Sequence, residues 1–110
     1  DESTGSNSYF IYSTPVSKRQ DAPVLLWLNG GPGASSLLGF YDELGPFGVN
    51  AQMQIVPRAV SWNKDAHLIA IDNPLGVGYS FTHSRARMAT NQTTVGADLY
   101  EALRQFFELN

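Results

Sequence analysis

The chain has 110 residues, of which 43% are hydrophobic, and its formal net charge is −3 at pH 7. This length sets a ceiling of one small domain, and the acidic balance, with only short basic clusters, argues against a nucleic-acid partner. No apolar run reaches the roughly 18 residues that a membrane helix requires. The polar residues 1–8 are expected to be neither a signal peptide nor an anchor, so no membrane partner is expected. Cysteine is absent, which excludes disulfides and thiolate metal sites within these residues.

The first two predicted elements are strands. Residues 8–14 contain four consecutive large β-forming side chains and end before Pro15. Residues 23–28 form an apolar run, which predicts a second strand buried on both faces. The polar link between the two runs predicts a hairpin with an exposed loop.

The second strand leads directly into a turn with three glycines, Asn29-Gly30-Gly31-Pro32-Gly33-Ala34-Ser35-Ser36. Such a turn exposes backbone N–H groups at the carboxyl end of a sheet, where α/β proteins bind ligands. Glycine also lets a substrate atom approach the main chain closely, so the turn predicts an oxyanion hole for acyl transfer. A phosphate loop is disfavoured because the turn has no lysine and Ser36 interrupts the dinucleotide pattern. A purely structural turn is the other interpretation.

The rest of the chain completes an α/β order. Residues 35–41 predict a short helix that Ser35 or Ser36 caps and that Gly45-Pro46 stops. A loop-rich stretch with Trp62 as its large side chain leads to a third strand at residues 67–72, far enough along the chain for parallel pairing with the second. A second glycine turn covers residues 75–79. Residues 94–109 predict a helix with one apolar stripe, formed by Val95, Leu99, Leu103 and Phe106.

Four segments carry a resemblance to a known family: residues 24–36 (VLLWLNGGPGASS), 43–46 (ELGP), 61–63 (SWN) and 71–80 (IDNPLGVGYS). In this order and spacing they resemble the amino-terminal part of a serine carboxypeptidase, from about Tyr9 to Phe107. The start of the second glycine turn, Asp72-Asn73-Pro74, and the helix around Asp98 look most like the vitellogenic-carboxypeptidase-like branch.

The resemblance implies a partial α/β-hydrolase fold, with residues 1–110 as the amino-terminal part of one such domain. It implies removal of carboxyl-terminal residues from peptides by a Ser-Asp-His triad, without a cofactor. It also implies a location in the secretory pathway, in a lysosome or vacuole, or outside the cell. The partners it implies are a peptide or protein substrate with a free carboxyl terminus and the remainder of the same domain.

The resemblance also assigns roles to individual residues. Gly31 matches the glycine whose N–H forms half of the oxyanion hole. Trp27, Asn29 and Gly30 match positions that recognise the terminal carboxylate of the substrate. Glu43 resembles a glutamate that shares a hydrogen bond with a second glutamate beside the nucleophile, and such a pair keeps one proton, which predicts activity at acidic pH.

These residues also have structural interpretations. Trp27 as core packing, Asn29 as an ordinary turn residue and Glu43 as an exposed helix end would need no chemistry. The spaced set as a whole favours the carboxylate-binding role. The sequon Asn91-Gln92-Thr93 marks Asn91 as a candidate glycosylation site, although sequons also arise by chance.

Two departures from the family pattern stand out. Ala34 occupies the position that is usually cysteine, so a disulfide that tethers the turn cannot form. The nucleophile turn of Gly-x-Ser-x-Gly type and the later triad aspartate and histidine are not in the chain. His67, His83 and Asp72 are not expected to replace them, and their spacing predicts no metal site.

This chain alone is therefore expected to be inactive. Three interpretations follow: a segment of a serine carboxypeptidase, a truncated peptide-binding protein without catalysis, or a segment of a carboxypeptidase-like acyltransferase.

Overall fold

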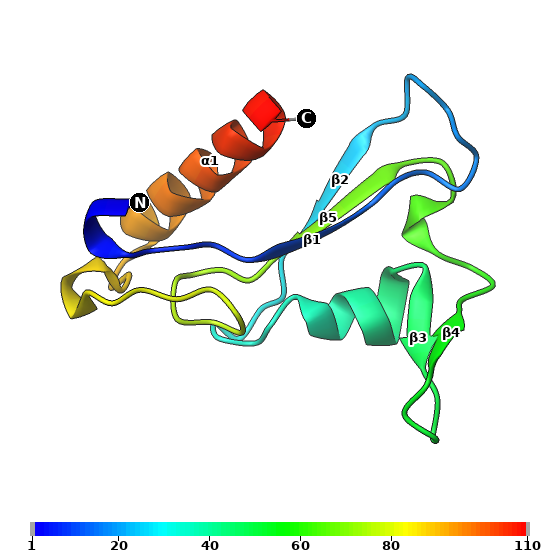
Figure 1. The fold of residues 1–110 in the computed structure, drawn as a ribbon, viewed down its shortest axis with the longest axis horizontal. Helices are drawn as coiled ribbons and strands as arrows, with labels where there is room; N and C mark the ends of the chain where they lie inside the picture. Colours follow the sequence, from blue (N-terminus) through cyan, green and yellow to red (C-terminus); the bar gives the residue numbers. More distant parts are fainter. Residues whose placement is uncertain (1, 110) are drawn as a thin grey trace.

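The computed structural model describes residues 2–109, which contain five strands, one long α-helix and several short helical segments (Figure 1). The strands are β1 (Phe10–Ser13), β2 (Val24–Trp27), β3 (Phe47–Val49), β4 (Ile55–Pro57) and β5 (His67–Ile71). The helical segments are η1 (Glu2–Thr4), η2 (Gly39–Leu44), η3 (Trp62–Lys64), η4 (Arg85–Arg87) and α1 (Gln92–Leu109).

β5 is the central strand of a three-stranded sheet with the order β1-β5-β2. It pairs parallel with β2, with Val24 opposite His67, and antiparallel with β1, with Phe10 opposite Ile71. The parallel pairing predicted from the long connection is therefore confirmed. The predicted hairpin of the first two strands is wrong, because β5, which is apolar towards both faces, lies between them.

The sheet is covered by a helix on each face, as Figure 1 shows for α1 and η2. On one face, Phe40 and Leu44 of η2 pack with Leu68 and Ala70 of β5. On the other face, Phe106 of α1 packs with the intervening residues of the same strand. Because successive strand side chains point to opposite faces, β5 contributes to both cores. By contrast, the side chains of β2 alternate between half-buried and exposed, so the prediction that this strand is buried on both faces is wrong.

The predicted long helix is confirmed as α1, which begins two residues earlier than expected. The predicted short helix begins at Leu37 and continues to Leu44, with wide π-type turns in η2, and it ends at Gly45 as expected. The Leu37 N–H donates to Ser35 Oγ at 3.2 Å, so Ser35 caps this segment. The sequence did not reveal the two-stranded sheet of β3 and β4, because three-residue strands are too short to show alternation and Gly48 and Pro57 argue against them.

Among residues 2–109, no helix is both long enough and apolar enough to cross a membrane. These residues also contain no cluster of three histidine or acidic side chains that could hold a metal ion.

Candidate functional site

A groove of about 680 Å³ lies where β2 and β5 end and α1 begins. The first glycine turn (residues 29–36) forms one wall, residues 73 and 74 lie at the end of β5, and the first turns of α1 form the other wall. The groove is lined by Asn29, Gly30, Gly31 and Asn91, among other residues. Its place at the carboxyl ends of parallel strands is the usual ligand position in open α/β sheets.

Gly31 presents a backbone donor at this groove. Its φ is +140°, and a Cβ atom would lie 3.1 Å from the N atom of Gly33, so the turn requires glycine at this position. Within residues 2–109, the N–H groups of Gly30 and Gly31 donate no hydrogen bond, and both residues are exposed. Two neighbouring N–H groups are therefore available to a ligand atom that carries negative charge.

The Asn29 side chain is held by two donors. The Trp27 Nε1–H group donates to Asn29 Oδ1 at 2.8 Å, and the Gly39 N–H donates to the same oxygen at 3.2 Å. The acceptor side of the amide is thereby occupied, whereas the Nδ2 group donates no hydrogen bond within the described part of the chain. The half-buried Asn29 thus offers a second kind of donor next to Gly30.

Sequence reasoning missed the part that Gly39 plays here. A Cβ atom at Gly39 would lie 2.1 Å from Trp27 Nε1 and 2.9 Å from Asn29 Oδ1. The absence of a side chain at Gly39 is what lets η2 approach the indole and the amide. A glycine inside a predicted helix was the only signal in the sequence, because glycine is a poor helix former.

Glu43 lies on the exposed side of η2 and does not line the groove. The structure therefore brings Trp27, Asn29 and the two glycines together but leaves Glu43 on the neighbouring helix. Arg58 holds the end of that helix: its Nε–H group donates to the carbonyl oxygen of Gly45 at 3.0 Å, and its Nη2 group donates to the carbonyl oxygen of Tyr41.

A buried carboxylate, Asp72, joins the two glycine turns. Its Oδ1 atom accepts hydrogen bonds from Ser35 Oγ at 2.7 Å and from the Ser36 N–H at 2.8 Å. Its Oδ2 atom accepts one from the N–H of Tyr79, in the second glycine turn, at 2.9 Å. The residue is 2% exposed, so all three donors reach it away from solvent.

Two buried serines extend this polar cluster. Ser36 Oγ accepts the Asn29 N–H at 3.0 Å and donates to the carbonyl oxygen of Ile71 at 2.5 Å. Ser80 Oγ donates to the carbonyl oxygen of Asp72 at 2.6 Å and accepts the N–H of Tyr9. Both ends of the first glycine turn are therefore fastened to the end of β5.

The two histidines lie elsewhere. The ring of His67 stacks on Tyr12, with centroids 5.7 Å apart, and its Nδ1 atom lies 2.5 Å from the Tyr12 hydroxyl oxygen. The ring of His83 contacts that of Phe81 at 5.3 Å. Neither histidine lines the groove, and the carboxylate of Asp72 is occupied by the two turns.

Asn91 lies at the start of α1, on the rim of the groove. Its Oδ1 atom accepts the Thr94 N–H at 2.9 Å, so it caps the helix. The residue is exposed.

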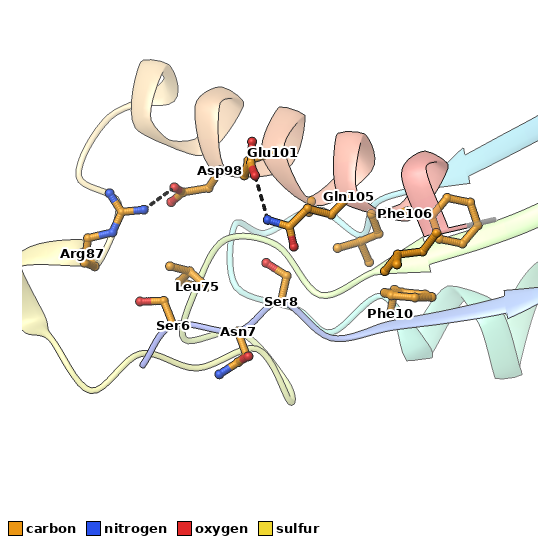
Figure 2. A pocket seen from close by; sticks show the side chains of 13 residues that line it. Ser6, Asn7, Ser8, Phe10, Leu75, Arg87, Asp98, Glu101, Gln105 and Phe106 are labelled. Atoms are coloured by element: carbon orange, nitrogen blue, oxygen red, sulfur yellow. Dashed lines mark hydrogen bonds and ion pairs between the residues drawn. The ribbon is translucent and has the colours of Figure 1, made fainter. Parts of the chain in front are cut away.

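A second cavity, of about 200 Å³, lies between the amino-terminal segment and α1 (Figure 2). Arg87 Nη2 and Asp98 Oδ1 are 2.9 Å apart, and Gln105 Nε2 donates to Glu101 Oε1 at 2.7 Å. Hydrogen bonds from Arg104 and from this amide lower the pKa of Glu101 to about 2. This cavity is smaller than the roughly 300 Å³ at which ligand pockets begin, so the groove at the glycine turns is the candidate site.

Helices lie on both faces of a parallel strand pair, as in α/β proteins. The N–H groups that donate no hydrogen bond lie at the carboxyl ends of these strands.

Known proteins identify the family. The serine carboxypeptidase family matches residues 1–110. The vitellogenic carboxypeptidase of Aedes aegypti is 44% identical over 109 residues, which are 99% of this chain and 23% of that protein. The venom serine carboxypeptidase of Apis mellifera is 48% identical over 104 residues, which are 94% of this chain and 22% of that protein.

A solved structure agrees. The crystal structure of Kex1(delta)p, a prohormone-processing carboxypeptidase from Saccharomyces cerevisiae, superposes with a TM-score of 0.78 at 29% identity and covers 94% of this chain and 23% of that one. The chain belongs to the serine carboxypeptidase family, and the resemblance seen in the sequence is confirmed. It spans less than a quarter of the length of these relatives.

Proposed function

We propose that this chain is the amino-terminal part of an α/β-hydrolase domain in a serine-type carboxypeptidase. The full-length protein removes residues from the carboxyl end of peptides and works best at acidic pH. This segment supplies one oxyanion donor and part of the pocket for the terminal carboxylate. The observation that supports it most is the pair of free N–H groups in Gly30 and Gly31 beside the oriented amide of Asn29.

The oxyanion role falls to Gly31. A backbone N–H on a fixed turn stabilises the developing negative charge of an acyl-transfer intermediate without reorganising during the reaction. Gly31 is exposed and lines the groove, its N–H group donates no hydrogen bond within the described residues, and the turn around it requires glycine. The nucleophile and the second donor belong to other parts of the full-length protein.

The carboxylate pocket is formed by Asn29 and Gly30. Because Trp27 and Gly39 occupy the acceptor side of the amide, its donor side is left for an anion. Hydrogen bonds from several neutral donors suit a carboxylate of the substrate. Glu43, which lies outside the groove, shares a proton with a second carboxyl group of the full-length protein, and that group donates to the substrate carboxylate, so binding depends on acidic pH.

Asn91 is the proposed glycosylation site, and the protein is proposed to pass through the secretory pathway to a lysosome, a vacuole or the cell exterior. Its side-chain oxygen caps α1 while the nitrogen that would carry the glycan donates no hydrogen bond within the described residues. We expect enzymatic removal of N-linked glycans to lower the mass of the secreted protein and of Thr93→Ser. Thr93→Ala, which destroys the sequon, should show no glycan at this site, and an unglycosylated Asn91 in the wild type would contradict the proposal.

The carboxylate pocket is tested with pairs of peptides that differ only at the carboxyl end, as free acid or methyl ester. In the full-length protein, Asn29→Ala and Glu43→Gln should raise KM for the free acid by about tenfold, because the first removes a donor to the carboxylate and the second removes the shared proton that lets the neighbouring carboxyl group donate to it. Ester hydrolysis should change less than about twofold. Asp42→Asn is the matched control, since it removes the same charge from the neighbouring exposed residue.

Equal losses on acid and ester would show that Asn29 and Glu43 support the fold or the chemistry in general. Absence of any serine-dependent hydrolysis by the wild type would instead favour a peptide-binding protein or an acyltransferase.

A further inference from the structure

The buried carboxylate of Asp72 has no part in the function proposed above. Removing a carboxylate from water is costly unless hydrogen bonds replace its hydration. Asp72 is 2% exposed and accepts three hydrogen bonds, all of them from the two glycine turns. Burying this carboxylate costs free energy, and its three hydrogen bonds serve only to join the two glycine turns. The position of these turns is therefore important.

The first glycine turn depends on this junction for its position. Residues 30–33 are exposed, and Gly31 and Gly33 have φ values of +140° and +122°, so the middle of the turn has few contacts of its own. Its start is held by the hydrogen bond from the Asn29 N–H to Ser36 Oγ, and its end by the bonds from Ser35 and Ser36 to Asp72. The sequence has no cysteine, so no disulfide shares this task.

The second glycine turn fixes the other side of the carboxylate. Gly78 has φ +55°, and a Cβ atom there would lie 2.0 Å from Asp72 Oδ2. The backbone of this turn therefore approaches the carboxylate as closely as glycine allows, and the Tyr79 N–H holds the same oxygen. The carboxylate is held from two sides and leaves Oδ1 directed at the first turn.

We propose that Asp72 is a positioning residue for the oxyanion hole: through Ser35 and Ser36 it holds the first glycine turn so that the Gly31 N–H meets the developing oxyanion. We call Ser35, Ser36 and Asp72 the turn clasp. This inference rests on the oxyanion role proposed for Gly31. A displacement of a reacting group by about 1 Å can cost about 10²-fold in rate, so loosening the clasp should act on the chemical step.

The test compares Ser35→Ala with Ser35→Thr in the full-length protein. Alanine removes one donor to Asp72 and the cap on Leu37, whereas threonine keeps the hydroxyl group. We expect Ser35→Ala to lower kcat about tenfold on free-acid and ester peptides alike, with KM within twofold of wild type, and Ser35→Thr to recover most of the loss. Ser17→Ala, an exposed serine in the loop after β1, is the control substitution.

Asp72→Asn should show the same pattern with a larger loss, because an amide places N–H groups opposite the N–H donors of the turns. If Asp72→Asn does not fold, the comparison of Ser35→Ala with Ser35→Thr still tests the proposal. An unchanged kcat in folded Ser35→Ala would overturn the inference, and so would a rise in KM confined to free-acid peptides, which would place Ser35 in the carboxylate pocket.

A second readout separates this inference from the proposed function. Hydrogen exchange of the Asn29 and Ser36 backbone N–H groups, which the clasp holds in hydrogen bonds, should be faster in Ser35→Ala than in wild type and Ser35→Thr. If the wild type hydrolyses no peptide, the proposed function fails, yet faster exchange still supports the clasp as the structure that holds the turn. Unchanged exchange in Ser35→Ala overturns the clasp whether or not the protein is a peptidase.

Discussion

Two glycines in this chain are required for different physical reasons. Gly31 is required by its own backbone, because its φ is +140°. Gly39 is required by its neighbours, because a side chain there would collide with the indole of Trp27 and the amide of Asn29. The first glycine supports the proposed oxyanion donor, and the second supports the proposed carboxylate pocket.

Alanine substitutions should therefore give different kinetic defects. Gly31→Ala strains the turn and crowds the donor, so kcat should fall about 10²-fold on free-acid and ester peptides alike. Gly39→Ala displaces Trp27 or Asn29, so KM for the free acid should rise while the ester is affected less. Steady-state kinetics on the full-length protein measure both, with melting temperatures to show that each variant is folded. The same defect in both variants would mean that the two glycines serve the fold only.

Among the elements, η2 is held at its carboxyl end by Arg58. The side chain is half-buried, and it donates to the carbonyl groups of Tyr41 and Gly45, which η2 leaves without helical partners at its end. Its own N–H donates to the carbonyl oxygen of Pro46 at 2.8 Å, which joins β4 to the chain after the helix. Arg58 thereby fixes the helix that carries Glu43.

Replacing Arg58 by alanine should destabilise the protein by about 1–3 kcal/mol, because charged hydrogen bonds to buried carbonyl groups are lost. Chemical denaturation of the full-length protein measures the free energy of unfolding. Arg19→Ala is the control, since the Arg19–Asp21 ion pair is exposed and contributes little. A loss for Arg58→Ala no larger than that of the control would show that η2 is held by its apolar face alone.

The elements differ in how well the sequence predicts them. α1 was predictable because an apolar stripe over about three turns has few alternatives, and the two glycine turns were predictable because glycine and proline end strands. The strand order was not predictable from neighbours in the chain: β5 displaces β1 from β2 because a strand that is apolar on both faces gains most by lying in the centre. That choice depends on residues 40 or more positions apart.

The residues of the candidate site also differ in how well the sequence predicts them. Asn29, Gly30 and Gly31 stand together in the sequence and are together in the groove. Gly39 and Asp72 act through contacts between segments that only the fold brings together, and no local pattern reveals them. Glu43 follows the family pattern; it is exposed on η2 and does not line the groove.

β2 forms an edge of the three-stranded sheet among the described residues. Val24 and Leu26 are 41% and 37% exposed, and one side of the strand has no partner among the described residues. An exposed apolar edge is a template for pairing with another chain. In the full-length protein we expect further chain to cover this edge.

The 110-residue chain in isolation should therefore associate and should hydrolyse no peptide, since it contains no nucleophile turn. Light scattering and thermal unfolding in dilute buffer measure the first property, and incubation with a blocked dipeptide at pH 5 measures the second. A monomer with a sharp reversible transition would show that β2 needs no partner. Turnover that a serine-directed phosphonate abolishes would reveal a triad within this chain.

We propose that the first glycine turn binds the reacting carbonyl oxygen and the terminal carboxylate of a peptide. The most direct test is a crystal structure of the full-length protein with a peptide phosphonate that ends in a free carboxylate. The Gly31 N atom should lie about 2.7–3.1 Å from the phosphonyl oxygen, and Asn29 Nδ2 and the Gly30 N atom should donate to the terminal carboxylate. A phosphonyl oxygen bound only by other donors, or a terminal carboxylate that lies away from Asn29 and Gly30, would contradict the claim.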